Sequence, residues 1–357
     1  MKIAIIAPPV NTIPPERQGG LEIILAYKIE ALVKMGHEVH LFGAGENNIS
    51  GISYNKIFPK SLSEIAIDPV NMEASRKLRL ETSYMINVLE KIINDQQNFD
   101  CIFNHTRATE LLPLLIFDKI RTPIFNIFHL PILSEHIDVI KKFPNSLFIS
   151  ISDDQRADYP GVKNFVGTVH NGIDPDKYPF SKDTDEFILW VGTIGAHKNP
   201  LEAIKVAQAI NSKIILMGKI RDQDYFEENI KDHIDNKIVK YLGEINYTDK
   251  LPYFQKAKVA IFPTKIREAC PVTPIELTMC GTPVVAYPSG GTKEIIENGI
   301  NGFLVDNFES LIEKTKEAYE LNRQTCHEFT KNNFSSEVMA KKYLEIVDNF
   351  NTNGIKK

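Results

Sequence analysis

Two glutamates frame a short uncharged stretch in the second half of the chain. The sequence REACPVTPIELTMCGTP occupies residues 267–283, and Glu268 and Glu276 stand in it with seven residues between them. Thr273, Pro274 and Glu276 together form a pattern typical of a helix start, with Thr at the N-cap, Pro at the first helical position and Glu at the third. Capping therefore accounts for Glu276, whereas Glu268 precedes the predicted helix and has no structural explanation.

The surroundings of Glu268 and Glu276 indicate what these acids could bind. The residues between them carry no charge, and a helix N-terminus without basic side chains still offers its own N–H groups to an anion. Carboxylates beside that helix end would repel a bare phosphate, but they suit hydroxyl groups. A ligand with both phosphate and many hydroxyl groups, such as a nucleotide sugar, fits this arrangement.

A lysine follows an apolar run earlier in the same half of the chain. In WVGTIGAHKNP, residues 190–200, Gly192 ends the predicted strand and Lys198 precedes a helical pattern. A lysine in this position can neutralise a phosphate as a point charge. On composition alone, a solvated surface lysine is the more common interpretation.

Two glycine pairs also stand between predicted strands and helices. Gly19 and Gly20, in ERQGGLE, allow backbone N–H groups to approach an anion at a helix N-terminus. The second pair lies in PSGGTKE, residues 288–294, where a plain turn is the preferred interpretation. Neither pair completes the GxGxxG pattern of dinucleotide-binding proteins.

Histidines and aspartates supply weaker candidates. His129 and His170 end predicted strands, and His105 has a comparable position; such side chains can donate to a sugar hydroxyl or to a developing charge, or they can be purely structural. Three DxD triplets could bind a metal with a diphosphate, but we expect them to be solvated loops. They are residues 174–176, 183–185 and 222–224.

Composition limits the class of protein. The chain has 357 residues, long enough for two domains, and a formal net charge of −5 without a basic stretch, which argues against a nucleic-acid partner. Its four cysteines form no CxxC pair, so they are expected to be reduced thiols of a cytoplasmic protein. No apolar run approaches the roughly 18 residues of a membrane helix, although peripheral contact with a membrane stays open.

Strand and helix patterns alternate along the chain, which predicts an α/β fold with parallel sheets covered on both faces. Strands are expected at residues 2–7, 37–42, 101–104, 124–128, 147–151, 165–169, 187–191, 214–217, 239–242, 259–262, 284–286 and 303–305, and helices at 21–35, 72–94, 200–210 and 335–350. We infer two doubly wound, Rossmann-like domains joined near residues 171–185, with a polar break at 331–333 before the last helix. Ligands bind beyond the carboxyl ends of such strands, so two sheets facing each other would form a cleft.

Taken together, these motifs resemble the retaining nucleotide-sugar glycosyltransferases of the GT-B fold, the group that includes glycogen and starch synthases. Besides the Gly19–Gly20 loop, the matching segments are NGID (residues 171–174), VGTIGAHK (191–198), EACPVTPIELTMCGTPVVA (268–286) and PSGGTKEIIENGINGFLV (288–305). The resemblance covers nearly the whole chain. It implies an acceptor-side domain at 1–174, onto which the helix at 335–357 packs back, and a donor-binding domain at 175–334.

The resemblance also implies roles for individual residues. Lys198 would bind the donor diphosphate, Glu268 the hydroxyl groups of the transferred sugar, and Glu276 the ribose. His129 would contact the donor sugar near the reacting carbon. The backbone around Val272 and Thr273, together with the Gly19–Gly20 loop, would line the phosphate and sugar. The implied reaction needs a nucleotide-sugar donor and a carbohydrate or glycoconjugate acceptor, and neither a metal nor another cofactor.

The sequence departs from the family pattern at Thr193, where the family has an arginine. The diphosphate loses one charge-assisted partner there, and Arg17 or Arg267 could replace it. The departure keeps open a nucleotide-sugar-binding protein with weak or lost turnover. A nucleotide-sugar epimerase, which would need no acceptor, is a second alternative. A dinucleotide oxidoreductase is a third, and the missing GxGxxG motif counts against it.

Overall fold

The computed structural model describes residues 1–15, 19–66, 72–95 and 99–353. It divides into two compact units, one formed by Met1–Gly172 with Ser336–Lys357 and the other by Ile173–Ser335. The sequence predicts the corresponding boundaries at 174/175 and 334/335. Each unit is built on one parallel sheet, so the predicted fold class of two doubly wound α/β domains is confirmed.

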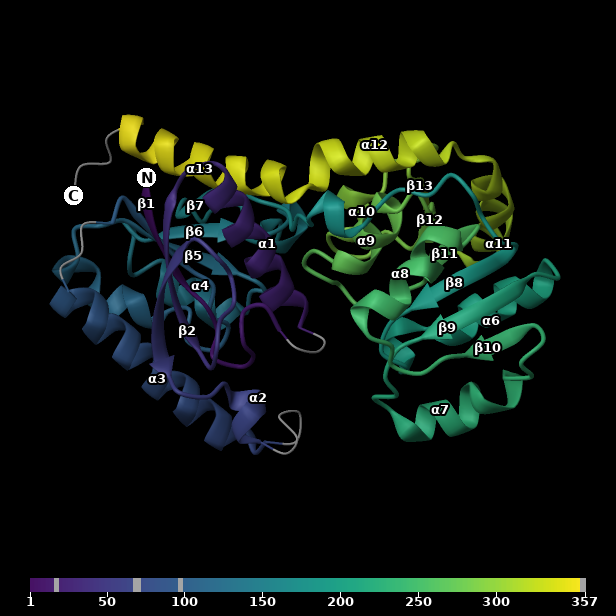
Figure 1. The fold of residues 1–357 in the computed structure, drawn as a ribbon, viewed down its shortest axis with the longest axis horizontal. Helices are drawn as coiled ribbons and strands as arrows, with labels where there is room; N and C mark the ends of the chain where they lie inside the picture. Colours follow the sequence, from purple (N-terminus) through teal and green to yellow (C-terminus); the bar gives the residue numbers. More distant parts are fainter. Residues whose placement is uncertain (16–18, 67–71, 96–98, 354–357) are drawn as a thin grey trace. The chain divides into compact units, whose positions relative to one another are not determined.

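The first unit contains a seven-stranded sheet in the order β3-β2-β1-β4-β5-β6-β7 (Figure 1). Its strands are β1 (Lys2–Ile6), β2 (Glu38–Ala44), β3 (Ile52–Phe58), β4 (Cys101–Asn104), β5 (Ile124–Phe128), β6 (Leu147–Ser150) and β7 (Phe165–Thr168). Its helices are α1 (Gly20–Lys34), α2 (Leu62–Ile65), α3 (Ala74–Asp95), η1 (Leu112–Lys119), α4 (Ser134–Ile140), α5 (Asp153–Arg156) and α13 (Ser336–Asn353).

Alternating side chains of the central strands fill the core on both faces of this sheet, as a period of two requires. Ala4 and Ile6 pack with residues of α3. On β4, Ile102 belongs to that same cluster, whereas its neighbour Phe103 contacts Tyr343 of α13 at a ring separation of 5.2 Å. Helix α13 packs along α1 (Figure 1), so the last helix of the chain completes the core of the first unit.

Strand β3 is the strand of this sheet that the sequence pattern does not predict, and the short helices α2, η1, α4 and α5 were not predicted either. Strand β3 is paired on one side only, with β2, and none of its residues is fully buried. An edge strand of this kind carries polar residues and lacks the continuous apolar run that marks the buried strands.

The second unit contains a six-stranded sheet in the order β10-β9-β8-β11-β12-β13. Its strands are β8 (Phe187–Val191), β9 (Lys213–Met217), β10 (Val239–Tyr241), β11 (Val259–Phe262), β12 (Val284–Ala286) and β13 (Gly302–Leu304). Its helices are η2 (Pro175–Lys177), η3 (Ala196–Lys198), α6 (Pro200–Ala209), α7 (Gln223–Asn229), η4 (Lys231–His233), α8 (Tyr247–Lys256), α9 (Val272–Met279), α10 (Thr292–Ile295), α11 (Phe308–Glu317), η5 (Ala318–Glu320) and α12 (Arg323–Phe334). The core of this unit includes Trp190, which is 1% exposed.

The polar break predicted at residues 331–333 is wrong. Those residues form the last turn of α12, and the helix ends at Ser335, whose extended backbone (φ −74°, ψ 158°) separates α12 from α13. Lysine and asparagine side chains favour a loop by composition, but Thr330 and Phe334 on either side of them are buried and keep this turn in the helix.

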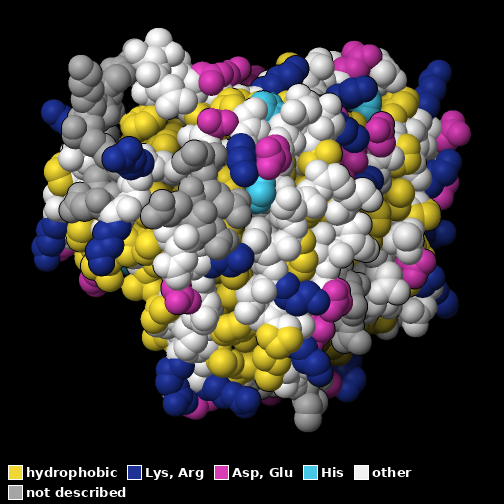
Figure 2. Space-filling view, turned by 60° about the vertical axis from the view of Figure 1, so that its left-hand side comes forward, with side chains coloured by type: hydrophobic (Ala, Val, Ile, Leu, Met, Phe, Trp, Pro, Cys, Tyr) yellow, Lys and Arg dark blue, Asp and Glu magenta, His cyan; other side chains and the backbone are white. Residues whose placement is uncertain are grey.

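None of the described helices is both long and apolar enough to cross a membrane. Figure 2 shows basic, acidic and hydrophobic side chains mixed over the visible face.

Candidate functional site

The two sheets reverse their strand order at corresponding places. In the second unit β8 pairs with both β9 and β11, and in the first unit β1 pairs with both β2 and β4. Ligands of open α/β sheets bind at such switch points, beyond the carboxyl ends of the strands. The residues that follow β8 and β11, and those that follow β1 and β4, are therefore the candidates that the topology selects.

Lys198 and Glu268 meet at the switch point of the second unit. Lys198 ends η3 after β8, Glu268 lies in the loop after β11, and Lys198 Nζ donates to Glu268 Oε1 at 2.5 Å. Both side chains are largely shielded, with exposed fractions of 18% and 21%. Lys198 is therefore not the solvated lysine that composition favours, since it is held beside a carboxylate at the edge where ligands bind.

The backbone of Glu268 is held in place by the second glycine pair. Gly291 N donates to Glu268 O at 2.8 Å. Gly290 has φ +59°, and a Cβ there would lie 2.1 Å from Glu268 O and 2.7 Å from Glu268 N. The pair in PSGGTKE is thus more than a plain turn, because it packs against the backbone of Glu268, the candidate sugar-binding acid.

Substituting Gly290 by Ala is expected to lower both stability and activity. The left-handed backbone alone costs about 1–2 kcal/mol for a non-glycine residue, and the contact with Glu268 must also be relieved by moving one of the two loops. The free energy of unfolding should therefore fall by more than about 2 kcal/mol in urea denaturation.

Gly299 provides the matched control for this substitution. It has φ +78° and open space where a Cβ would lie, so Gly299→Ala should show only the backbone cost, about 1–2 kcal/mol. Equal effects of the two substitutions on stability and turnover would contradict the positioning role of Gly290.

The capping box predicted for Thr273, Pro274 and Glu276 is wrong. Helix α9 begins at Val272, with Pro271 as an N-cap in extended conformation and without a side-chain cap hydrogen bond. Thr273 therefore lies inside the first turn, and Glu276 lies in the second turn, too far along the helix to reach the N-cap. Pro274 stays compatible with this start because the first-turn N–H groups have no intrahelical acceptor.

Glu276 instead forms a buried polar cluster. It is 7% exposed, and its Oε1 accepts from Tyr178 Oη at 2.5 Å and from Lys250 Nζ at 2.9 Å. Both of these hydrogen bonds end on Oε1, so Oε2 is the oxygen that a ligand hydroxyl could use. Tyr178 and Lys250 were not identified from the sequence, because neither is close to the E-x₇-E stretch along the chain.

Thr193 lies beside a histidine and a shallow cavity. Thr193 Oγ1 is 3.4 Å from His197 Nε2. His197 and Arg221, which the sequence motifs do not single out, line a cavity of about 540 Å³. Of the two arginines proposed to replace the missing one, Arg267 is exposed next to Glu268, and Arg17 lies outside the described residues.

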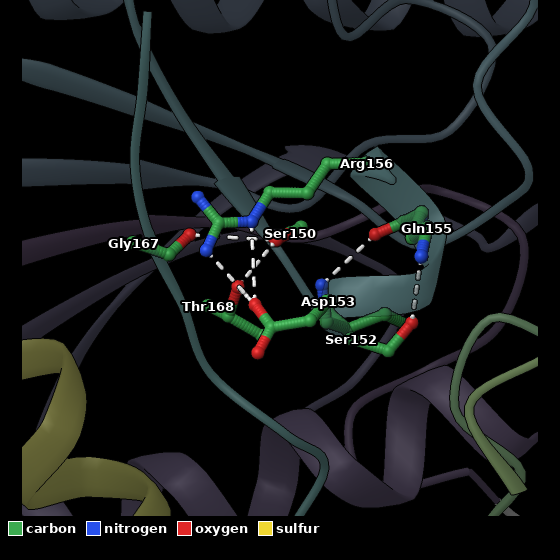
Figure 3. Close-up of polar contacts among 8 residues, drawn as sticks. Ser150, Ser152, Asp153, Gln155, Arg156, Gly167 and Thr168 are labelled. Carbon is green, nitrogen blue, oxygen red and sulfur yellow. Dashed lines mark hydrogen bonds and ion pairs between the residues drawn. The ribbon is translucent and has the colours of Figure 1, made fainter. Parts of the chain in front are cut away.

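His129 belongs to the first unit and follows β5. Gln155 Nε2 donates to Phe128 O at 3.0 Å and to Leu130 O at 2.7 Å, so it fixes the backbone on both sides of His129. Gln155 belongs to α5, and Figure 3 shows it within a network of polar contacts that joins α5 to the ends of β6 and β7. Within this network Asp153 Oδ1 accepts from Thr168 Oγ1 at 2.6 Å and from Arg156 at 2.9 Å.

His105 proves to be the partner of His129. The two rings lie 5.1 Å apart, and His105 Nδ1 is 2.8 Å from His129 Nε2. Because β4 and β5 are neighbours in the sheet, residues that directly follow them meet at one edge, and this adjacency was the signal available in the sequence. His170 is half-buried after β7.

Gly19 and Gly20 begin helix α1, with Gly19 as its N-cap. A Cβ on Gly19 would lie 2.9 Å from Glu22 Oε2. Glu22 is 1% exposed, and its carboxylate lies 3.7 Å from Arg107 Nη2. The glycine pair thus lies at the helix end where the sequence predicts it, next to an acid and an arginine.

The aspartate triplets have local structural roles. Asp174 caps η2 by accepting from Asp176 N, and Asp222 caps α7 by accepting from Tyr225 N. Asp183 lies in an exposed ion pair with Lys256 at 3.8 Å. Among the described residues, no three His, Cys, Asp or Glu side chains converge in a way that could hold a metal ion.

The fold is that of the GT-B glycosyltransferases, as solved structures show. The chain superposes on a sucrose-phosphate synthase from Thermosynechococcus elongatus with a TM-score of 0.75 at 16% identity, over 99% of this chain and 100% of the synthase chain. The HepE protein of Anabaena, solved in complex with UDP-glucose, matches 98% of this chain over 100% of its own with a TM-score of 0.67 at 18% identity.

Sequence comparison finds a family to which the second unit is similar. Residues 175–335 match the family model described as glycosyl transferases group 1. An uncharacterized glycosyltransferase of Methanocaldococcus jannaschii, MJ1607, is 22% identical over 347 residues, covering 85% of each chain. The match to glycosyl transferases group 1 thus covers residues 175–335, and the likeness to the solved glycosyltransferase structures extends over the fold of nearly the whole chain.

Proposed function

We propose that this protein transfers a sugar from a nucleotide diphosphate sugar to an acceptor hydroxyl group, with retention of the anomeric configuration. The observation that carries the proposal is the Lys198–Glu268 pair at the switch point of a group 1 domain. A cation and a carboxylate held side by side suit a ligand that presents a diphosphate next to sugar hydroxyls. The complex of a protein of this fold with UDP-glucose supports that class of donor.

The mechanism requires the developing charge of the leaving diphosphate to be stabilised. Lys198 supplies a positive charge, and the N-terminus of α9 at Val272 and Thr273 supplies N–H groups without side-chain competition. In the free protein Glu268 holds the ammonium group of Lys198. Donor binding would exchange that partner for phosphate oxygens and leave Glu268 to accept hydrogen bonds from the sugar.

The remaining site residues orient the donor. Glu276 presents Oε2 to the ribose hydroxyls while Tyr178 and Lys250 hold Oε1. His129 would contact the sugar near the reacting carbon, and the Gly19–Gly20 loop would approach the phosphate. The four cysteines are buried and are not joined in disulfides, which suits a reducing compartment, so we propose that the reaction takes place in the cytoplasm. Peripheral contact with a membrane stays a prediction.

A panel of nucleotide diphosphate sugars tests this function. Thermal-shift measurements should show stabilisation by one donor class, since a ligand at about 100 times its Kd stabilises the folded state by roughly 2.7 kcal/mol. Turnover of that donor should then require an acceptor. The second candidate, a binding protein without turnover, is favoured by Thr193 alone, and it predicts stabilisation by the donor without consumption in any acceptor series.

Removal of divalent metal is expected to leave transfer unchanged. The charge on the leaving group is met by Lys198 and the α9 N-terminus, and the capping aspartates of the DxD triplets are engaged with backbone N–H groups. Initial rates should agree within about twofold with and without a chelator, a difference of about 0.4 kcal/mol in the barrier. Loss of activity that returns on adding Mg²⁺ or Mn²⁺ would mean that a metal carries the diphosphate.

A further inference from the structure

The ring of His129 is held by a buried chain of nitrogen groups. Lys28 Nζ of α1 lies 3.0 Å from His105 Nε2, and His105 Nδ1 lies 2.8 Å from His129 Nε2. Lys28 and His105 are each 1% exposed. This series of hydrogen-bonding groups thus leads from the core of the first unit to the half-buried His129 at the carboxyl edge of the sheet.

Lys28 is buried in the core without a carboxylate partner among the described residues. Its ammonium group lies 3.8 Å from the ring centre of Phe103 and 3.4 Å from that of Tyr343, and burial lowers its pKa well below the ordinary value. In the described part of the chain, His105 is its hydrogen-bond partner and no carboxylate pairs with it. Burying a cation without a counter-ion is unfavourable, and an apolar side chain of similar length would pack there at less cost.

The chemistry of Lys28, His105 and His129 determines which group donates in each of their hydrogen bonds. An ammonium group can only donate, whereas the corresponding amine can also accept, so it is the charged form of Lys28 that sets the direction. If Lys28 donates to His105 Nε2, the neutral His105 ring must carry its proton on Nδ1 and donate it to His129 Nε2. The proton of His129 then lies on Nδ1, the nitrogen for which the described residues provide no partner.

We propose that Lys28 and His105 are positioning residues that fix the tautomer of His129, so that its Nδ1–H is a permanent hydrogen-bond donor. The use of that donor on a sugar rests on the function proposed above, whereas the tautomer itself does not. Gln155 fixes the backbone of His129, and the Lys28–His105 chain fixes its ring.

Burial first, and neighbouring positive charges second, lower the pKa of both imidazoles. Burial, Arg107 and Lys28 lower the pKa of His129, and burial, Lys28 and His129 lower that of His105. Cys101 acts on the pKa of Lys28 in the opposite direction to burial, and Glu22 lies beside Arg107 without hydrogen-bonding either ring. A donor that does not ionise near neutral pH can bind a hydroxyl oxygen without acting as an acid.

Nitrogen-15 NMR of labelled histidines in the full chain tests the tautomer directly. The proposal predicts protonated Nδ1 and unprotonated Nε2 for both His105 and His129 near pH 7. His105→Asn keeps an N–H donor near the former Nδ1 and should preserve the His129 tautomer, whereas His105→Leu should move the His129 proton to Nε2 or mix the two forms. A wild-type His129 with its proton on Nε2 would overturn the proposal.

Activity and stability of the Lys28→Met variant separate positioning from a structural role. This variant should melt at or above the wild-type temperature and lose roughly 10–100-fold in kcat, by comparison with the loss of the hydrogen-bond partner that orients a metal-binding side chain. Activity that is retained in His105→Asn but lost in His105→Leu would also support the positioning role of His105. Unchanged kcat in a folded Lys28→Met variant would overturn it. If NMR shows the predicted tautomers but neither the wild-type protein nor any variant transfers sugar, the proposed function is wrong and the proposal about the His129 tautomer stands.

Discussion

Replacing Glu268 by Gln is expected to lower kcat/KM for sugar transfer by about 100-fold, or about 3 kcal/mol in the barrier, in a chain that stays folded. Glutamine keeps the shape of the side chain but cannot accept hydrogen bonds on both oxygens or carry charge beside Lys198. Glutamine still offers one oxygen to Lys198, so losing the charge of this largely shielded pair should lower the free energy of unfolding by about 1–3 kcal/mol.

Glu313 is the matched control, since it lies exposed on α11 in the same unit. Glu313→Gln should leave kcat/KM and the melting temperature at wild-type values. Near-normal transfer by a folded Glu268→Gln variant would remove Glu268 from the site.

Replacing Lys198 by Met is expected to have the largest effect of all, a loss of about 100- to 1,000-fold in kcat. This is the range found when one preorganised donor to a developing negative charge is removed. Thr193 leaves Lys198 without the arginine that the family places nearby, so fewer groups share the charge of the diphosphate. Rapid-quench measurement of the transfer step would separate this loss from weaker donor binding.

Two further variants sharpen this prediction. Lys205→Met changes an exposed lysine on the neighbouring helix α6 and should keep full activity. Because Lys198 and Glu268 are in direct contact, the double variant should lose less activity than the two single losses combined. Strict additivity would mean that the two residues act on the ligand independently and that their ion pair has no role.

The sequence predicts the buried strands and the residues after them well. Each of these strands is a short apolar run, and parallel topology places the residues that follow neighbouring strands at one edge. This is why Lys198 and Glu268, 70 residues apart, lie together as the motif order indicated. It is also why His105 deserved more weight, since it follows the strand next to that of His129.

Contacts between residues far apart along the chain could not be predicted from the local sequence pattern. Lys28 lies in the run LEIILAYKIEALV, where a single lysine is expected to reach solvent with its head group; packing of α13 over α1 encloses it instead. The capping box failed for a related reason. Local pattern placed the helix start at Thr273, but Pro271 in extended conformation starts α9 at Val272 and frees Glu276 for Tyr178 and Lys250.

The most direct test of the proposed function is an NMR time course of wild-type protein with a stabilising nucleotide diphosphate sugar, with and without an acceptor. We expect one nucleoside diphosphate to be released for each glycoside formed, only when acceptor is present, and the glycoside to keep the anomeric configuration of the donor. Conversion of the donor without any acceptor, or an inverted anomeric centre in the product, would contradict the assignment as a retaining glycosyltransferase.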